Sequence, residues 1–415
     1  MILRARTVLP ITAPPIENGA VVVSGNQIDA VGKWTDLKSD FSSEEIFNLG
    51  EVVLLPGLVN AHCHLDYTDM AGQLPPPKTF LDWIPQMLAA KAAWSYTDYA
   101  RSWLNGAKML LQTGTTTVAD IEAVPELLPE MWNATPLRVF SFLEMTGVRS
   151  KREPTDILNE AISRIESLSH SRCRIGLSPH APYSTSLELL QLSAKVAREK
   201  NLRITTHIAE SEQEFEMFAR ARGKMFDWLK KNGRDISDCG IGSPIQHLER
   251  AGLLGENFLA VHANYLGESD FDLLAKRNVS VVHCPHSHDY FKHRKFPLEK
   301  LIKAGVNICL GTDSLATTTG SGKQKPALNL FAEMQLLAKE NSSLSSKIIL
   351  QMATTNGASA LGMGGKIGKL SENAFADLIA IPFDGKIADI YDAVLHHAST
   401  ISASMVDGKW ALRRD

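Results

Sequence analysis

The chain has 415 residues, of which 44% are hydrophobic and 21% charged, and its formal net charge at pH 7 is −3. This length suits one large domain, or a large domain with a small one attached. Such a charge gives no reason to expect a nucleic-acid or membrane-surface partner, and no apolar run reaches the roughly 18–20 residues that span a bilayer. The five cysteines show no CxxC spacing and the N-terminus lacks the pattern of a secretory signal, so we expect a cytoplasmic protein.

The two ends of the chain predict short strands and turns. Near the N-terminus, the apolar run 20–23, the turn residues 24–27 and the apolar positions Ile28 and Val31 indicate a β-hairpin. The C-terminal segment from about residue 366 has a similar pattern, with the apolar stretch 376–381 as its clearest strand. We therefore expect residues 1–55 and 366–415 to form one small β-sandwich domain built from both chain termini.

The middle of the chain, residues 56–365, alternates short apolar strands with amphipathic stretches of helical length. The predicted strands are Leu54–His64, Thr115–Asp120, Arg138–Glu144, Arg174–His180, Arg203–Glu210, Phe258–His262, Val279–His283 and Val306–Asp313. Between them, helical patterns include Tyr96–Gln112, Asp156–Leu168, Ser186–Glu199 and Glu212–Lys230. Eight strands that alternate with helices predict an α/β fold, a (β/α)8 TIM barrel, rather than an open doubly wound sheet.

Titratable residues gather at the C-terminal ends of these predicted strands. They are His62, His64, Asp120, Glu144, His180, His207, His262, His283 and Asp313. One histidine at a strand end carries little information, but a coincidence across most of the strands is hard to arrange. The C-terminal rim is where barrel enzymes place their chemistry, so the pattern predicts an enzyme.

His62 and His64 end the first predicted strand, in the run PGLVNAHCH of residues 56–64. Side chains two positions apart on a strand point the same way, so the two imidazoles lie side by side. Taken alone, the pair is also compatible with two structural histidines. Together with His207 and Asp313 it predicts a site for one divalent metal ion, Zn²⁺ or Fe²⁺, with a coordination position left for water.

Glu210 follows His207 by three residues, in the run THIAES of residues 206–211. Just beyond the strand end, its carboxyl group can reach over the metal without binding it. This position suits a proton shuttle between a water molecule and a substrate nitrogen. The alternative is an acidic residue at a helix N-terminus, together with Ser211 and Glu212.

Seven short motifs occur in order along the chain, in segments 56–64, 113–118, 178–183, 207–210, 261–262, 283–285 and 311–314. This series resembles the amidohydrolase superfamily over essentially the whole length. The similar branch is that of the mononuclear metal-dependent aminohydrolases, which holds cytosine, guanine, adenosine-type and S-adenosylhomocysteine deaminases and triazine chlorohydrolases. Binuclear members carry a carboxylated lysine at the end of the fourth strand, where this chain has His180, so the resemblance implies one metal.

The resemblance implies four metal ligands: His62, His64, His207 and Asp313. It also implies that His262 holds the attacking water or the developing oxyanion, and that Asp313 accepts the proton of that water. Glu210 would protonate the ring nitrogen next to the carbon under attack. An amine needs a proton to leave whereas chloride does not, so Glu210 and His262 together favour deamination over dehalogenation.

Four residues are predicted to contact the substrate. His180 is either a contact to a polar part of the substrate or a hydrogen-bonded rim residue. Trp83, in a long loop that enters a helix, either stacks on a heteroaromatic ring or packs the helix on the barrel. Arg149 either meets an anionic group or is a solvated charge. Relatives usually have asparagine where His288 stands, so His288 suggests a changed pocket contact.

We therefore expect hydrolytic deamination of an amino-substituted N-heteroaromatic ring. The candidates are purines or adenosine-derived metabolites such as methylthioadenosine, S-adenosylhomocysteine or aminodeoxyfutalosine, and the residues do not choose among them. A chlorohydrolase or cyclic amide hydrolase with the same metal site is the first alternative, and a non-catalytic binding barrel is the second. The expected partner is a small-molecule substrate, and a homodimer is an expectation from the frequency of such assemblies alone.

Overall fold

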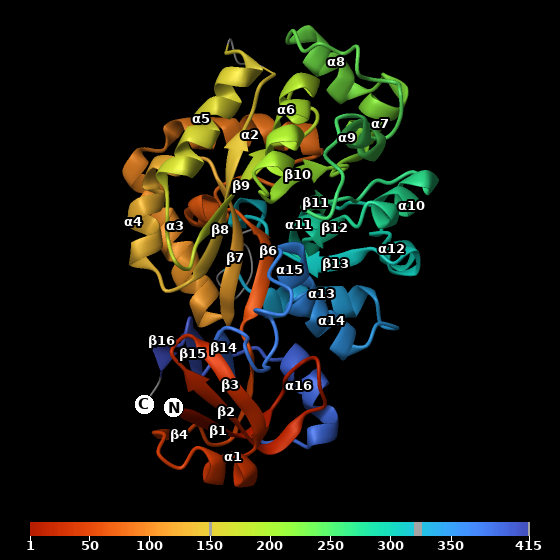
Figure 1. Ribbon diagram of the computed structural model, residues 1–415. Coiled ribbons are helices and arrows are strands. Elements are labelled where there is room, and N and C mark those ends of the chain that lie inside the picture. Colours follow the sequence, from red (N-terminus) through yellow and green to blue (C-terminus); the bar gives the residue numbers. More distant parts are fainter. Residues whose placement is uncertain (149–151, 319–325, 414–415) are drawn as a thin grey trace.

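The computed structural model describes residues 1–148, 152–318 and 326–413, so Arg149 and most of the segment 317–325 lie outside the described residues. The described chain forms two separate eight-stranded sheets (Figure 1). One sheet curves into a barrel that is surrounded by helices. The other gathers the first and the last strands of the chain at the bottom of the view.

The barrel strands run parallel, each paired with the next along the chain. They are β6 (Leu58–Cys63), β7 (Thr115–Glu122), β8 (Arg138–Met145), β9 (Arg174–Pro179), β10 (Ile204–Ile208), β11 (Phe258–His262), β12 (Ser280–His283) and β13 (Asn307–Leu310). The last and first strands meet where the carbonyl of His62 accepts hydrogen bonds from the amides of Thr312 and Asp313, at 3.0 and 3.1 Å. These contacts bring β13 beside β6, and the predicted (β/α)8 barrel is confirmed.

Helices cover the outside of the barrel. They are α2 (Phe80–Ala93), α3 (Tyr96–Gln112), α4 (Leu128–Ala134), α5 (Pro154–Ser167), α6 (Leu187–Glu199), α7 (Glu212–Arg220), α8 (Lys224–Lys231), α9 (Pro244–Arg250), α10 (Glu268–Lys276), α11 (Pro285–Tyr290), α12 (Leu298–Ala304), α13 (Leu330–Glu340), α14 (Ser346–Met352) and α15 (Thr355–Ala360). The short 3₁₀ segments here are η1 (Leu65–Met70), η2 (Pro125–Leu127) and η3 (Leu315–Thr317).

Helix α3 illustrates why these segments are helical. Ser95 caps it, since its hydroxyl accepts from the amide of Asp98 while the Asp98 carboxylate accepts from the Ser95 amide. Its apolar positions recur at helical spacing, so one face, with Trp103 and Leu110, is fully buried against the barrel. Burial of each such side chain stabilises the fold by about 1.5–3 kcal/mol.

The second sheet unites both chain ends. Its strands are β1 (Ile2–Val8), β2 (Ile16–Ser24), β3 (Gln27–Lys33), β4 (Ile46–Asn48), β5 (Val52–Pro56), β14 (Leu378–Pro382), β15 (Ala403–Val406) and β16 (Lys409–Arg413). Strands β2 and β3 form the predicted hairpin, and β14 pairs antiparallel with β5. Helices α1 (Trp34–Asp40) and α16 (Ile390–Leu395) and the 3₁₀ segment η4 (Ile387–Asp389) complete this part. The limits of the two domains, 1–55 with 366–415 and 56–365, stay a prediction.

Two predicted elements were wrong in their extent. The strand expected over Leu54–His64 is two strands, β5 and β6, which belong to different sheets and are separated at Gly57. A Cβ at this glycine would lie 2.0 Å from Oγ1 of Thr116, so the close approach to β7 requires glycine. The helix expected over Glu212–Lys230 is also divided, because Ala221 has a left-handed backbone conformation that ends α7 before α8 begins.

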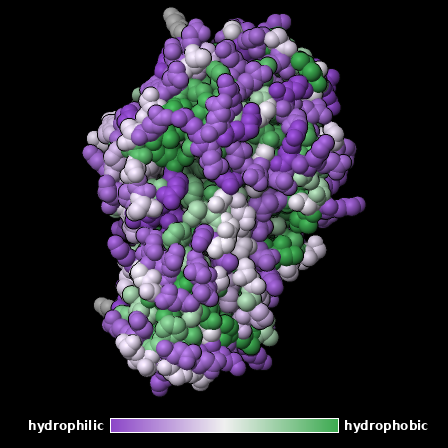
Figure 2. Space-filling view, in the orientation of Figure 1, coloured by the Kyte–Doolittle hydropathy of each residue, from purple (hydrophilic) through white to green (hydrophobic). Residues whose placement is uncertain are grey.

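The outer surface is mostly polar on the side shown in Figure 2, where apolar side chains form small separate areas. Among the described helices, none combines the length and the apolar character needed to cross a lipid bilayer.

Candidate functional site

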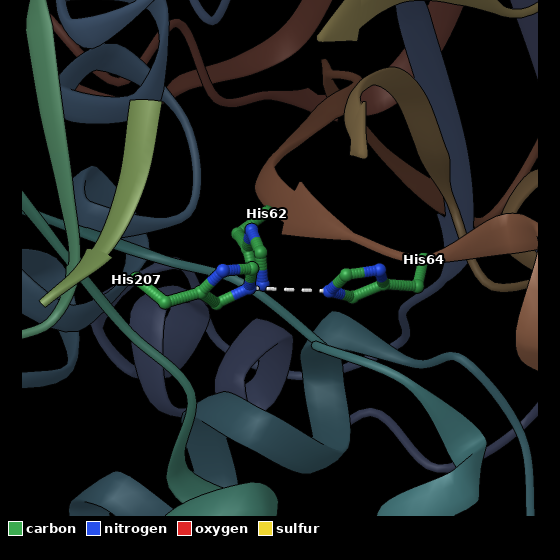
Figure 3. Close-up of side chains that lie close together, drawn as sticks. All are labelled: His62, His64 and His207. Carbon is green, nitrogen blue, oxygen red and sulfur yellow. Dashed lines mark hydrogen bonds between the residues drawn. The ribbon is translucent and has the colours of Figure 1, made fainter. Parts of the chain in front are cut away.

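Three imidazoles lie together at the C-terminal end of the barrel (Figure 3). His62 and His64 come from the end of β6, and His207 comes from β10. Nε2 of His64 lies 3.3 Å from Nε2 of His207. Two nitrogens bound at 2.0–2.1 Å to a tetrahedral zinc ion are also about 3.3 Å apart, so the spacing suits ligands of one metal ion.

Asp313 adds a carboxylate to these imidazoles. Its Oδ1 lies 3.5 Å from Nε2 of His62 and 3.7 Å from Nε2 of His64. Ligand atoms of His62, His262 and Asp313 also lie within 4.8 Å of one another, as do those of the three histidines above. Three nitrogens and one carboxylate oxygen, with a fifth group alongside, form a donor set that fits Zn²⁺ or Fe²⁺.

Within the described part of the chain, the ring nitrogens of His62 lack the hydrogen-bond partners that buried polar atoms normally have, which is consistent with a cation bound here. It is 1% exposed, yet neither ring nitrogen forms a hydrogen bond with any described residue. A buried polar atom without a partner costs about 1–3 kcal/mol, so such atoms are rare in folded proteins. A metal ion coordinated by the ring would supply the missing interaction.

The rings of His207 and His64 can each donate a nitrogen lone pair to a cation. The Nδ1 atom of His207 lies 3.0 Å from the carbonyl oxygen of His180, so this nitrogen donates and Nε2 keeps its lone pair toward the centre. Burial lowers the pKa of His207 well below its usual value, and the neighbouring imidazoles lower it further. Burial, with His62 nearby, lowers the pKa of His64 to about 3. Both rings are therefore neutral at physiological pH.

Asp313 stays ionised in this setting. Burial alone would raise the pKa of its carboxyl, but the His62 ring 3.5 Å away and the other nearby imidazoles outweigh burial and hold it well below the usual value. Its backbone has a φ of 52°, which is uncommon for a residue other than glycine. Strained backbone of this kind persists where the surrounding structure holds it, and it recurs at functional sites.

Glu210 and His262 face each other beside this cluster. Oε1 of Glu210 lies 3.6 Å from Nε2 of His262, and both side chains are buried. Burial raises the pKa of the Glu210 carboxyl well above its usual value, and the carboxylates of Asp313 and Glu214 raise it further. Burial lowers the pKa of His262 to about 3. Glu210 can thus carry a proton near neutral pH, while His262 is a neutral hydrogen-bonding group.

A cavity of about 720 Å³ opens onto these groups. Five of the predicted metal-binding and catalytic residues line it: His64, His207, Glu210, His262 and Asp313. Its lining includes apolar side chains such as Phe80, Met87 and Phe291. It also includes charged side chains, namely Glu126, Arg152, Glu160 and Arg164. A pocket of this size, mostly apolar with a few convergent polar groups, is typical of a small-molecule site.

Two predicted substrate contacts, His180 and Trp83, also line the cavity. The Nδ1 atom of His180 lies 2.7 Å from the hydroxyl of Ser184, which leaves Nε2 toward the cavity. Trp83, on α2, meets Phe291 edge to face with ring centroids 5.5 Å apart, so it both lines the cavity and packs its helix. Arg149 lies outside the described residues.

His288, predicted to contact the substrate, does not line this cavity. It lies on α11 and is buried. Its Nδ1 atom is 3.1 Å from Oδ1 of Asn264, so the ring packs behind the cavity wall. Two further rim residues also face away from the cavity: Asp120 accepts from the amide of Leu65 and the indole of Trp103, and His283 stacks on Phe296.

The sequence reasoning missed a charged pair in the cavity wall. Nζ of Lys91 lies 3.5 Å from Oε2 of Glu144, and Oε1 of Glu144 lies 3.9 Å from Nε2 of His180. The Lys91 ammonium and the imidazoles of His180 and His64 outweigh burial and lower the pKa of Glu144 to about 2. Glu144 was visible at a strand end, but Lys91 comes from the last turn of α2, where no motif marks it.

An eight-stranded parallel barrel with imidazoles, a carboxylate and a buried glutamic acid of raised pKa at its C-terminal end defines a metal-dependent hydrolase. The chain belongs to the amidohydrolase family, which it matches over residues 53–411.

Individual relatives agree with this assignment. A 5-methylthioadenosine/S-adenosylhomocysteine deaminase of Syntrophobacter fumaroxidans is 32% identical over 396 residues, which are 91% of this chain and 83% of that protein. An aminofutalosine deaminase of Helicobacter pylori, in complex with methylthio-coformycin, superposes with a TM-score of 0.86 at 20% identity, covering 99% of both chains. A zinc-containing atrazine chlorohydrolase of Arthrobacter aurescens gives a TM-score of 0.84 at 20% identity, covering 99% of this chain and 95% of that one. The two structural matches show that the fold is shared.

Proposed function

We propose that the protein is a metal-dependent hydrolytic deaminase of a purine or an adenosine-derived metabolite, and that it releases ammonia. The observation that carries the proposal is the position of Glu210 and His262, 3.6 Å apart, beside the imidazole cluster and on the same cavity. The relative from Syntrophobacter and the structural neighbour from Helicobacter are both named deaminases of such metabolites, which supports the substrate class.

The resident cofactor in this proposal is one divalent ion, either Zn²⁺ or Fe²⁺. Its ligands would be His62, His64, His207 and Asp313, whose ligand atoms converge at the end of the barrel. When bound, the ion would lower the pKa of a water molecule from about 16 toward 7 and so make it nucleophilic at neutral pH. His180 at the end of β9 in place of a lysine favours a single ion.

The protein's own groups would handle the protons. Asp313, a carboxylate at neutral pH, would accept the proton of the attacking water, and neutral His262 would hold the oxygen that becomes negatively charged. Glu210 carries a proton because its pKa is raised, and it would donate this proton to the ring nitrogen beside the carbon under attack. A further proton delivered to the amino group would let ammonia leave.

The size and charge of the cavity favour a nucleoside over a free base. About 720 Å³ exceeds the needs of a purine alone, and the remaining space is bounded by Lys91, Glu144 and His180. The 3.5 and 3.9 Å separations within this group leave hydrogen-bonding capacity that sugar hydroxyls could use. Apolar lining residues such as Met87 and Phe291 suit an additional uncharged substituent, such as the methylthio group of methylthioadenosine.

Two alternatives use the same cavity. A chlorohydrolase or a cyclic amide hydrolase needs the same metal site, and the fold similarity to atrazine chlorohydrolase keeps the first one open. Chloride leaves without a proton, so the raised pKa of Glu210 favours the deaminase. A non-catalytic binding barrel would have no reason to keep both the ligand set and the proton-carrying acid.

The test is ammonia release from protein of assayed metal content, across aminopurines, adenosine derivatives, cytosine and chlorotriazines. Ammonia from an adenosine derivative, abolished by chelation and restored by Zn²⁺ or Fe²⁺, is the expected result. Chloride or a ring-opened product from the fully metallated protein, without ammonia, would overturn the proposal in favour of the first alternatives. Binding without turnover of any compound would favour the binding barrel.

A further inference from the structure

The peptide backbone at Glu210 is held from both sides by buried side chains. Oε2 of Glu214 accepts a hydrogen bond from the Glu210 amide at 2.9 Å, and Nδ2 of Asn264 donates to the Glu210 carbonyl at 3.0 Å. Both side chains are almost completely buried. Neither of them lines the cavity, so their contacts serve the backbone and not a ligand.

This backbone makes an unfavourable turn as it leaves β10. Ala209 has a φ of 50°, a left-handed conformation that residues with a Cβ rarely adopt. Its amide donates to Oε1 of Glu214 at 2.9 Å, and its carbonyl accepts from the amide of Tyr265 at 3.0 Å. The turn places the Glu210 side chain over the cavity, so the bonds that maintain the turn also determine where that side chain can reach.

His288 fixes the orientation of the Asn264 amide. Because Nδ2 of Asn264 donates to the Glu210 carbonyl, its Oδ1 is an acceptor, and Nδ1 of His288 at 3.1 Å must be the donor. A flip of the amide would lose both hydrogen bonds at once. Asn264 follows β11 and His288 lies on α11. His288 therefore orients the Asn264 amide, and that amide in turn holds the Glu210 carbonyl.

We propose that Asn264, oriented by His288, is a positioning residue that sets the distance between the Glu210 carboxyl and the reacting nitrogen of the substrate. This inference rests on the proposed function, since it assigns to Glu210 the proton transfer described above. Neither Asn264 nor His288 lines the cavity. They affect the reaction only through the position of Glu210.

The first test compares Asn264→Ala and Asn264→Asp with the wild type in steady-state deamination. Alanine removes the hydrogen bond, and aspartate keeps the shape but cannot donate to a carbonyl while it is ionised. Both should lower kcat about 10- to 100-fold with KM changed less than about 3-fold, because a small misplacement of a proton donor affects the chemical step more than binding. Metal content should be unchanged.

The matched control is Asn257→Ala. Nδ2 of Asn257 donates to the Leu202 carbonyl at 3.0 Å, so it links the same pair of strands, β10 and β11, at the opposite end of the barrel. This variant loses an equivalent hydrogen bond far from Glu210, and its kcat should stay within about 2-fold of the wild type. An equal loss of kcat in the Asn257 and Asn264 variants would indicate general loosening of the barrel and would overturn the inference.

The decisive test is a double-mutant cycle with Glu210→Gln. If Asn264 acts through Glu210, adding Asn264→Ala to Glu210→Gln should cause no further loss of kcat, whereas independent effects multiply. His288→Leu alone should lower kcat less than Asn264→Ala does, and it should likewise cause no further loss when added to Glu210→Gln. It serves in place of the Asn264 variants if these do not fold. The inference is overturned if the losses of kcat multiply in the double variant, or if the single variants keep the kcat of the wild type.

These outcomes separate the inference from the proposed function. If Glu210→Gln retains full deaminase activity, the role of Glu210 and the positioning inference fail together, while the deaminase function stands. If the metallated wild type releases no ammonia from any compound, the proposed function fails. If Glu210→Gln is inactive while the Asn264 and His288 variants act independently of it, the proposed function stands and the positioning role alone fails.

Discussion

Arg138 and Asp377 form a buried ion pair that joins the barrel to the sheet made by the chain ends. Nε and Nη2 of Arg138, on β8, donate to the two carboxylate oxygens of Asp377 at 2.8 and 3.2 Å. Asp377 immediately precedes β14, and it also accepts from the amide of Asp407 at 2.7 Å. The guanidinium is 2% exposed and the carboxylate is fully buried, so the Asp377 charge depends on Arg138, which also donates to Oδ1 of Asp407 at 3.2 Å.

The first prediction concerns this pair. Arg138→Met leaves the Asp377 carboxylate buried without its counter-charge, and should lower the free energy of unfolding by about 3–5 kcal/mol. Chemical denaturation measures the loss. Arg277→Met is the control, because the Arg277–Glu249 ion pair is exposed to solvent and its removal should cost far less stability than Arg138→Met. Equal losses in the two variants would contradict the prediction.

The second prediction concerns the proton shuttle. Glu210→Gln keeps the size of the side chain but cannot transfer a proton, so kcat for deamination should fall at least about 100-fold while metal content stays the same. The neighbouring exposed residue supplies the control, since Glu212→Gln removes a carboxylate that faces solvent and should leave kcat unchanged. Unchanged turnover in Glu210→Gln would remove this residue from the mechanism.

The third prediction concerns the metal. Asp313→Asn removes one ligand charge and the acceptor for the proton of water, so both metal content and activity should fall. Because a ligand that binds only the folded state stabilises it, added Zn²⁺ should raise the Tm of chelator-treated wild type but not that of the variant. Metal analysis and thermal denaturation measure the two effects. An active, fully metallated Asp313→Asn protein would show that the ligand set is misassigned.

The fourth prediction concerns the charged pair in the cavity wall. If Glu144 accepts from sugar hydroxyls, Glu144→Gln should raise KM for an adenosine-type substrate about 10-fold or more, since hydrogen bonds to charged groups contribute about 1.5–3 kcal/mol. Adenine, which lacks the sugar, should bind equally well to both proteins. Isothermal titration with adenine and adenosine separates the two contributions. A parallel loss of affinity for both compounds would place Glu144 against the ring instead.

The fifth prediction is a pH dependence of stability outside the cavity. Burial lowers the pKa of His286, but Glu333, whose Oε1 lies 3.0 Å from its Nδ1, and the nearby Asp289 and Glu340 outweigh burial and raise it. A histidine whose folded-state pKa is raised stabilises the protein fully below about 6.5, and this contribution is lost as pH rises through the higher folded-state pKa.

His286→Ala should therefore cost stability at pH 6, by about 1 kcal/mol or less because the ring is partly exposed, and cost little at pH 9. Urea denaturation at the two pH values provides the comparison. The exposed His396, whose ring bonds a backbone carbonyl, is the control residue for alanine substitution. A difference between wild type and His286→Ala that stays constant from pH 6 to pH 9 would contradict the assignment.

Much of the barrel could be predicted because each parallel strand is buried on both faces and therefore appears as a short apolar run. The predicted residues at the strand ends then meet, since the carboxyl ends of parallel strands lie at one rim, and the ligand atoms of His62, His64, His207 and Asp313 do converge. Their role as metal ligands stays a prediction, as do the catalytic roles of Glu210 and His262.

The remaining features depend on tertiary packing that no local pattern records. Lys91 reaches the cavity because α2 lies across the barrel mouth, and periodicity does not specify how a helix crosses its neighbours. The direction of His288 could not be foreseen, because its partner Asn264 is 24 residues away and on another element. The division between β5 and β6 at Gly57 falls within an apolar run of the sequence, and the close contact with Thr116 explains why a glycine stands there.

The seam between β13 and β6 has a consequence for how the chain assembles. The groups that meet there, His62 and Asp313, are separated by most of the barrel sequence, and the sheet of the chain ends is likewise incomplete until β14 pairs with β5. A chain still emerging from the ribosome can therefore form the early strands. It can neither close the barrel nor bring His62, His64, His207 and Asp313 together. Synthesis must reach the last quarter of the chain before the predicted metal site can form, so truncated products would lack that site.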